Sequence, residues 1–133
     1  MNALQQFLTE HPVDNLTEQI IISERLKEFP FTIKGMTGND YNDYQTRCIE
    51  NPNSPKKRKF NSRKFNELIV INHTMEPNFK DADWLKATDC GMSPERLLYK
   101  TLLAGEITEL AQEILKLSGF DKDLEEEIEE VKN

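Results

Sequence analysis

The pattern of apolar and polar positions predicts a short β-hairpin near the N-terminus. Residues 17–26 contain three consecutive isoleucines, which favour an extended strand. The next apolar residues, Phe29, Phe31 and Ile33, follow the period of two that a half-buried strand shows. We expect the two segments to pair, with Pro30 placing the second strand at a sheet edge or marking its start. Because a lone hairpin is not stable in water, it needs helices packed against it.

A period of 3.6 residues predicts helices before and after this hairpin. Five of them begin at a residue that caps helices well. The expected caps are Asn2, Thr37, Ser62, either Asn78 or Asp81, and Ser93. The fold class is therefore α+β and mainly α, with the hairpin packed on a bundle of about five to six short helices in a single domain, residues 1–133.

Two of these helices have features that set them apart. Residues 2–10 carry Leu4, Phe7 and Leu8 on one face, but a helix this short is marginal in water and must dock or fray. The helix that begins at Ser62 is expected to be the most buried. Its apolar face is made by Phe65, Leu68, Ile69 and Met75.

Glycine divides the C-terminal third into its predicted helices. Gly105 and Gly119 are expected to separate helices at 94–103, 106–118 and 121–133, because glycine is the usual residue after a helix C-terminus. Phe120, Leu124, Ile128 and Val131 lie on one side of the last helix. This stripe is either part of the core or a mobile, partner-binding surface, and the pattern leaves both open.

Charge is concentrated at two places in the chain. From Glu106 onward there are ten carboxylates and three lysines, a difference equal to the net charge of −7 of the whole chain. Six basic residues form the opposite cluster. They are Lys56, Lys57, Arg58, Lys59, Arg63 and Lys64. We expect residues 51–62 to be a mobile basic loop that is solvated, or that binds nucleic acid or an acidic partner.

Composition and motifs argue against most other function classes. The acidic balance makes nucleic-acid binding an unlikely main role, since neutralising phosphates needs a basic surface. His11 and His73 are not paired with each other or with Cys48 and Cys90 at metal-ligand spacing. No nucleophile, phosphate loop or cofactor motif is present in the sequence, so we expect no enzyme, no metal and no cofactor. With neither a signal peptide nor a membrane span, the expected location is the cytoplasm.

Several short motifs occur in one order along the chain. Near the N-terminus they are Ser23-Glu24-Arg25 and Pro30-Phe31-Thr32-Ile33-Lys34 followed by Met36-Thr37. Further on they are Pro77-Asn78-Phe79-Lys80-Asp81-Ala82 and Gly91, Leu102-Leu103, Gly105-Glu106, Gly119-Phe120-Asp121 and Lys132-Asn133. This series resembles the XkdN-like tail assembly chaperones of long-tailed phages and PBSX-type prophages. The chain departs from the family pattern at Ala104, where many members have proline, and at Ile107, where tyrosine is common.

The resemblance implies a function and partners. Members of this family are expected to bind the tape measure protein, to help recruit the tail tube protein, and to be absent from the finished virion. It implies a non-catalytic protein of the bacterial cytoplasm, with self-association as a further expectation. Two alternatives stay open: a small structural component that is retained in the tail, and a nucleic-acid-binding regulator that acts through Lys56–Lys64.

Overall fold

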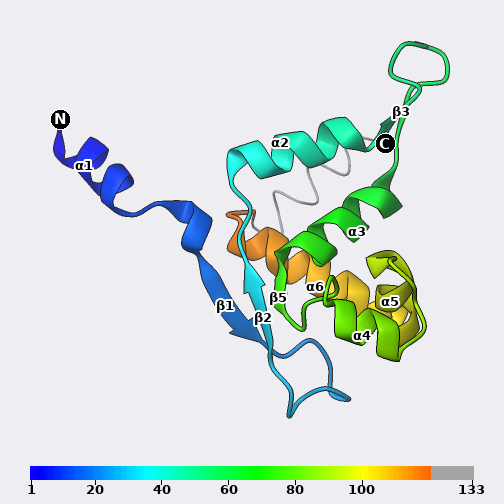
Figure 1. The fold of residues 1–133 in the computed structure, drawn as a ribbon. Helices are drawn as coiled ribbons and strands as arrows, with labels where there is room; N and C mark the ends of the chain where they lie inside the picture. The colour runs from blue at the N-terminus through cyan, green and yellow to red at the C-terminus, as the bar shows by residue number, and fades with distance from the viewer. Residues whose placement is uncertain (121–133) are drawn as a thin grey trace.

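A computed structural model of the chain describes residues 1–120, and within them it confirms an α+β fold that is mainly helical (Figure 1). In chain order the elements are α1 (Ala3–Glu10), the short 3-10 helix η1 (Val13–Asn15), β1 (Thr17–Ile20), β2 (Phe31–Lys34), α2 (Gly38–Arg47), β3 (Ile49–Glu50), β4 (Lys59–Phe60), α3 (Ser62–His73), β5 (Thr74–Glu76), α4 (Ala82–Ala87), α5 (Pro94–Thr101) and α6 (Ala104–Leu117). The predicted helix at 121–133 lies outside the described residues.

The predicted hairpin forms one side of a three-stranded antiparallel sheet with the order β1-β2-β5. Ile20 pairs with Phe31, so Pro30 immediately precedes β2 and marks its start, as one of the two predictions had it. The alternative, an edge position, is wrong because β5 pairs with the other side of β2. The first strand ends at Ile20 rather than at 26, since the chain turns after it.

The strand β5 was not predicted, because its residues continue the apolar run of the helix before it. The sequence pattern places Met75 on the helical face, but α3 ends at His73 and Met75 lies in β5 with an exposed side chain. Three residues are too few to show a strand period. Their pairing with β2 is a tertiary contact that no local pattern indicates.

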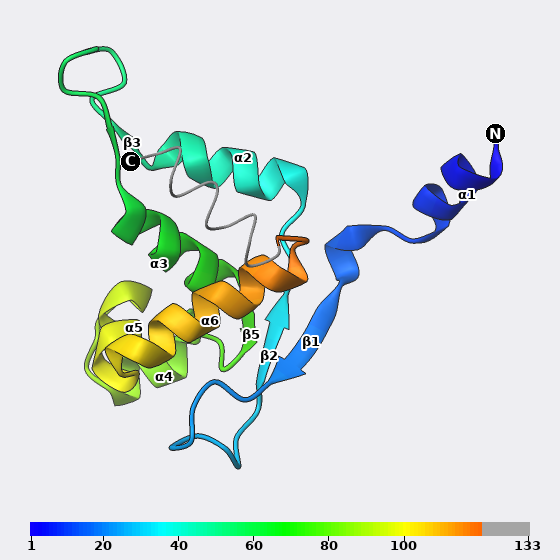
Figure 2. The ribbon, with the colours of Figure 1, turned by 180° about the vertical axis from the view of Figure 1, so that it is seen from behind.

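The core lies between the sheet and the two longest helices, α3 and α6, which pack on each other (Figure 2). Phe31 and Ile33 point into it from β2, whereas Thr32 and Lys34 are partly exposed. Among the described helices α3 has the largest number of buried side chains, as predicted, and it also contacts α2, α5 and β5. The largest fully buried side chains are Phe79, Ile33, Ile69, Leu97, Leu98, Leu110 and Ile114.

Capping residues set the helix starts, and four of the predicted caps are confirmed. Asn2, Thr37, Asp81 and Ser93 each accept a hydrogen bond from a backbone N–H of the first turn. The predicted cap of α3 is wrong by one position. The side chain of Asn61 accepts from Lys64 N–H at 3.0 Å and donates to Glu50 at 2.8 Å, which makes Ser62 the first helical residue.

The two glycines of the C-terminal third behave differently. Gly119 has φ +99°, and Phe120 N–H donates to the Leu115 carbonyl at 3.0 Å, which is the predicted glycine-terminated end of α6. Gly105 does not separate two helices. It lies in the first turn of α6, because α5 ends at Thr101 and the extended residues that follow make the connection.

The predicted basic loop at 51–62 is shorter than expected. Ile49 pairs with Phe60, and Glu50 with Lys59, so the two short strands close a loop of residues 51–58. We call β3, β4 and this loop the basic hairpin. Ser62 and the two basic residues after it belong to α3 and not to a loop.

A buried carboxylate joins the long β1–β2 connection to the start of α6. Both oxygens of Glu106 accept hydrogen bonds from Arg25, at 2.5 and 3.0 Å. The Ser23 hydroxyl donates to it at 2.6 Å and the Leu103 backbone N–H at 2.8 Å, and Arg25 also reaches the Thr101 carbonyl at 3.3 Å. We call Ser23, Arg25, Leu103 and Glu106 the Glu106 cluster.

The cluster holds the charged form of the Glu106 carboxyl. Its hydrogen bonds with Arg25 lower the pKa of Glu106 to about 2, against an opposing effect of burial, with further help from Ser23 and Leu103. Two motifs that carry the family resemblance, Ser23-Glu24-Arg25 and Gly105-Glu106, therefore meet in space although 83 residues separate Ser23 from Glu106. Their contact gives both motifs a structural reason.

The revised start of α3 predicts unequal effects of two neighbouring substitutions. Asn61→Ala should lower the free energy of unfolding by about 1–2 kcal/mol, because it removes the cap and the bond to Glu50. Ser62→Ala should change it by less than about 0.5 kcal/mol, since that side chain is exposed. Urea denaturation of the two variants measures both values. A larger loss for Ser62→Ala would restore Ser62 as the cap.

The Glu106 cluster predicts a loss of stability in acid. Because the folded pKa of about 2 lies below the ordinary value of 4.5, the stabilisation is complete above about pH 4.5 and is lost as the pH falls toward 2. Glu106→Gln should cost about 2–3 kcal/mol at pH 7 and weaken this dependence.

The matched control is Glu113→Gln on the same helix, where Lys116 lies 3.4 Å away in a partly exposed ion pair. It should cost less than about 1 kcal/mol. Urea denaturation at pH 7, 4.5 and 3 compares the three proteins. If Glu106→Gln loses stability between pH 4.5 and 3 in parallel with the wild type, the proposed role of the cluster is contradicted.

Candidate partner-binding surfaces

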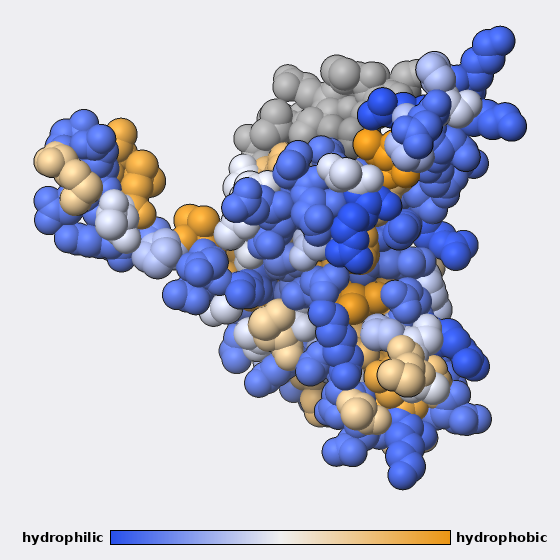
Figure 3. Space-filling model, turned by 45° about the horizontal axis from the view of Figure 1, so that its top comes forward, coloured by the Kyte–Doolittle hydropathy of each residue, from blue (hydrophilic) through white to orange (hydrophobic). Residues whose placement is uncertain are grey.

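The N-terminal helix α1 stands apart from the rest of the protein (Figure 1). It is held together by its own hydrogen bonds: the side chains of Asn2 and Gln5 each accept from the other's backbone N–H at 2.8 Å. None of its residues is buried, and Leu4, Phe7 and Leu8 are 65%, 56% and 62% exposed. The helix is thus formed but not docked on the described part of the chain, and its apolar side chains face solvent (Figure 3).

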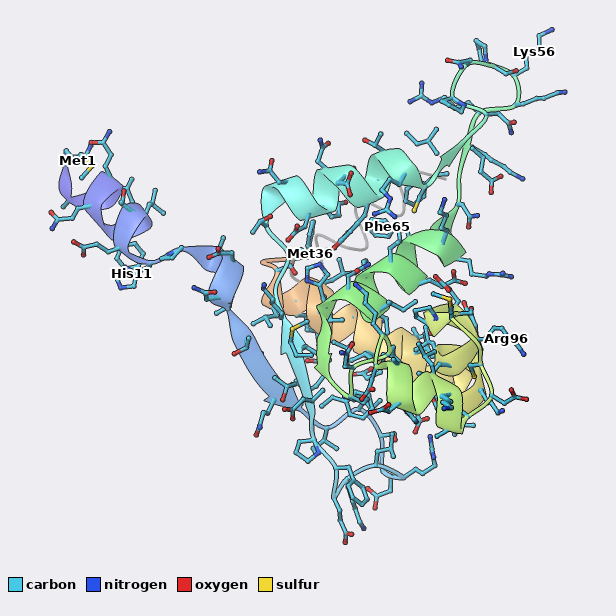
Figure 4. All side chains as sticks on the ribbon, viewed as in Figure 1. Met1, His11, Met36, Lys56, Phe65 and Arg96 are labelled. Atoms are coloured by element: carbon cyan, nitrogen blue, oxygen red, sulfur yellow. The ribbon has the colours of Figure 1, made fainter. Side chains whose placement is uncertain are left out.

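The basic hairpin projects from the other side of the molecule, with Lys56 at its tip (Figure 4). Lys56, Lys57 and Arg58 are exposed, and none of them forms an ion pair with a carboxylate among residues 1–120. Lys59 lies 3.4 Å from Glu50, which partly neutralises the base of the hairpin. The structure therefore concentrates exposed positive charge at the tip.

The remaining two predicted basic residues lie on the first turn of α3 and have partners. Arg63 lies 3.3 Å from the Glu67 carboxylate, and Lys64 donates to the Arg47 carbonyl at 3.2 Å. The Tyr99 hydroxyl also donates to Glu67 at 2.6 Å, and burial together with this carboxylate raises the pKa of Tyr99 to about 12. The predicted cluster of six is thus divided into an exposed tip and a paired base.

An open hollow of about 710 Å³ lies beside this hairpin. It is lined by Gln45, Ile49, Pro55, Arg58, Lys59, Phe60 and Ser62. These side chains are polar, basic or apolar, and they include neither a carboxylate nor a histidine. The hollow can therefore accept an acidic or amphipathic segment, and the lining residues within 1–120 do not provide an acid–base pair.

Four aromatic rings connect the end of the described chain to the hairpin. The ring of Phe120 lies 5.0 Å from that of Tyr41, Tyr41 lies 5.8 Å from Phe65, and Phe65 lies 5.4 Å from Phe60. Phe120 is half-buried by this contact with α2. The other three residues of the predicted C-terminal stripe, Leu124, Ile128 and Val131, lie outside the described residues.

The buried histidine of α3 has a structural role. Nδ1 of His73 lies 3.2 Å from the Lys34 carbonyl oxygen, and Nε2 lies 2.8 Å from the Tyr44 hydroxyl. Because a carbonyl can only accept, Nδ1 carries the proton and Nε2 accepts from tyrosine. Burial lowers the pKa of His73 and raises that of Tyr44. This pair joins α2, α3 and β2 and keeps the imidazole neutral.

The described residues do not bring metal-ligating side chains together. Within residues 1–120 no group of three or more His, Cys, Asp or Glu side chains could hold a metal ion. Cys48 and Cys90 are both buried and not bonded to each other. None of the helices in the described part of the chain has the length and apolar character to cross a membrane.

Sequence reasoning missed two features that the fold creates. In the sequence, Glu106 is the first of the ten carboxylates of the C-terminal segment, and nothing local shows that this one is buried and paired with Arg25. The apolar face of α1 was recognised, but its lack of cover is a tertiary fact. The nearest signal for it is Pro12, which ends the helix and separates it from the strand that follows.

The comparisons with known proteins agree with the fold and the motifs. A family model described as "Phage XkdN-like tail assembly chaperone protein, TAC" matches residues 4–132. A search of curated proteins found no match. Among solved structures, the crystal structure of the protein YqbN has a similar fold, with a TM-score of 0.68 at 21% sequence identity. The match covers 91% of this chain and 99% of that one.

The family match extends over almost the entire chain, including both motifs that form the Glu106 cluster. It confirms the resemblance on which the functional expectation rests. The chain belongs to the XkdN-like family of phage tail assembly chaperones.

Proposed function

We propose that the chain binds the tape measure protein during assembly of a long phage tail. The family match over residues 4–132 is the observation that carries this proposal. By holding the tape measure protein until tail tube subunits surround it, the chain would prevent its apolar stretches from aggregating. It would act in the cytoplasm of the host, help to recruit the tube protein, and leave before the virion is complete.

The described surfaces support this role. A chaperone of an elongated helical partner needs exposed apolar contacts that are individually weak, so that tube subunits can displace it. The exposed face of α1 has this character, and the stripe of Phe120, Leu124, Ile128 and Val131 remains a second proposed contact. The basic hairpin would affect the orientation and the rate at which the chain associates with its partner more than the affinity. None of these roles requires catalysis, a metal or a cofactor.

Co-expression tests the proposal directly. The tape measure protein of the same phage should be recovered in the soluble fraction, bound to this chain, and should aggregate when the chain is omitted. The chain should also be absent from purified virions. A tape measure protein that stays soluble and unbound would overturn the proposal, and a chain found in virions would favour a structural component of the tail.

The C-terminal stripe predicts the behaviour of a truncated chain. Deletion of residues 121–133 should weaken binding to the tape measure protein by about tenfold or more while the remaining chain still folds, because the described core is built from earlier residues. Pull-down and thermal unfolding measure the two effects. Complete unfolding of the truncated chain would show that this segment belongs to the core.

The exposed tip of the basic hairpin supports a second candidate function, binding of nucleic acid. If that is the role, DNA retention should fall steeply with salt and be abolished by changing Lys56, Lys57 and Arg58 to glutamate. Under the main proposal, these changes leave the affinity for the tape measure protein within about tenfold of the wild-type value. Any difference should arise from a slower association rate.

A further inference from the structure

The N-terminal arm, residues 1–15, is shaped for contact with something outside its own domain. The arm ends just before Leu16, whose carbonyl accepts a hydrogen bond from the Gly35 N–H at 2.9 Å. Within the arm, no residue of α1 is buried. An isolated eight-residue helix is marginal in water. Here the reciprocal capping of Asn2 and Gln5, and the His11 ring stacked 4.2 Å from Phe7, stabilise the helix in advance.

The chemistry of the arm indicates an apolar contact. Charged residues make up 31% of the chain, but Glu10 is the one charged side chain in α1. Leu4, Phe7 and Leu8 form a stripe with the i, i+3, i+4 spacing by which amphipathic helices insert into grooves. A partner that fits this face must offer an apolar surface, and charge adds little to the contact.

The size of the stripe restricts the kind of partner. Complete burial of the three side chains would cover about 300–400 Å² on this chain. A stable pair of proteins needs about 800 Å² on each side. One arm is therefore too small for a stable dimer. It suits a weak, reversible contact that gains strength when many copies bind along one elongated partner.

We propose that the stripe of Leu4, Phe7 and Leu8 binds the apolar face of an amphipathic helix in the tape measure protein. The inference rests on the proposed function. It assigns the binding of the tape measure protein to a surface that is separate from the C-terminal stripe. Each arm contributes a small contact, and the length of the partner determines how many arms bind. Because the arm lies outside the core, it can bind and release without unfolding the domain.

A triple variant, Leu4→Gln, Phe7→Gln and Leu8→Gln, tests this inference. Glutamine favours helices, so α1 retains its propensity and loses its apolar face. We expect the apparent affinity for the purified tape measure protein, measured with that protein immobilised on a sensor surface, to fall by about tenfold or more. The thermal midpoint should not change, and the wild-type affinity should vary by less than about threefold between 0.1 and 0.5 M salt.

The matched control replaces two exposed apolar residues outside the arm. Phe29 and Met92 are 67% and 96% exposed, so Phe29→Gln with Met92→Gln changes a comparable apolar surface and should leave the affinity unchanged. Equal binding by the triple variant and the wild type would overturn the inference and leave the proposed function intact. A wild-type chain that does not bind would overturn both.

Sedimentation without the partner separates contacts between copies from contacts with the tape measure protein. We expect the wild type and the triple variant to sediment alike over the concentration range of the binding assay. If the wild type forms oligomers that the triple variant loses, and both bind the tape measure protein equally, the arm joins copies of this chain and the inference is wrong.

Discussion

The buried carboxylate of Glu106 is the constraint on which the arrangement of the domain depends. A charge removed from water must be matched by donors, and here Arg25, Ser23 and the Leu103 backbone supply them. Those donors come from the β1–β2 connection and from the start of α6 itself. The Glu106 carboxylate therefore caps α6 and also joins α6 to the β1–β2 connection. With α6 fixed, α3 can pack between it and the other helices to complete the core.

Outside this core the chain presents surfaces of different chemistry. The arm around α1 is apolar and almost uncharged, whereas the tip of the basic hairpin is exposed and positive. A protein whose stability resides in its core can use such surfaces for weak contacts, because changing them costs little folding energy. This separation is compatible with the proposed binding and release of the tape measure protein.

Local chemistry was sufficient to predict most of the helices and the hairpin. Asn2, Thr37 and Ser93 cap helices through contacts within one turn, and Phe31 and Ile33 alternate within a single strand. The errors occurred where distant residues decide. β5 forms because β2 pairs with it. Asn61 is the cap in place of Ser62, and its side chain is also held by a hydrogen bond to Glu50 on β3. Gly105 lies inside α6 because Glu106, which is held by the distant Ser23 and Arg25, accepts from the Leu103 N–H and so starts the helix before the glycine.

The candidate surfaces were predictable to a different degree. The sequence located the basic residues and the apolar stripes, since both follow from the types of residue and their spacing. It could not show that Arg63 and Lys64 are engaged with α3 and α2, or that α1 stands apart from the core. Exposure and pairing are properties of the folded chain. For this reason the exposure of the arm follows from the fold and not from the sequence.

Hydrogen exchange of the chain alone and bound to the tape measure protein would show whether α1 is the element that contacts the partner. We expect backbone amides of α1 to exchange rapidly in the free chain and to become protected in the complex. Amides of α3 and α6 should be protected in both states, because their residues form the core. If the partner leaves the protection of α1 unchanged and adds protection only in other elements, α1 is not the contact.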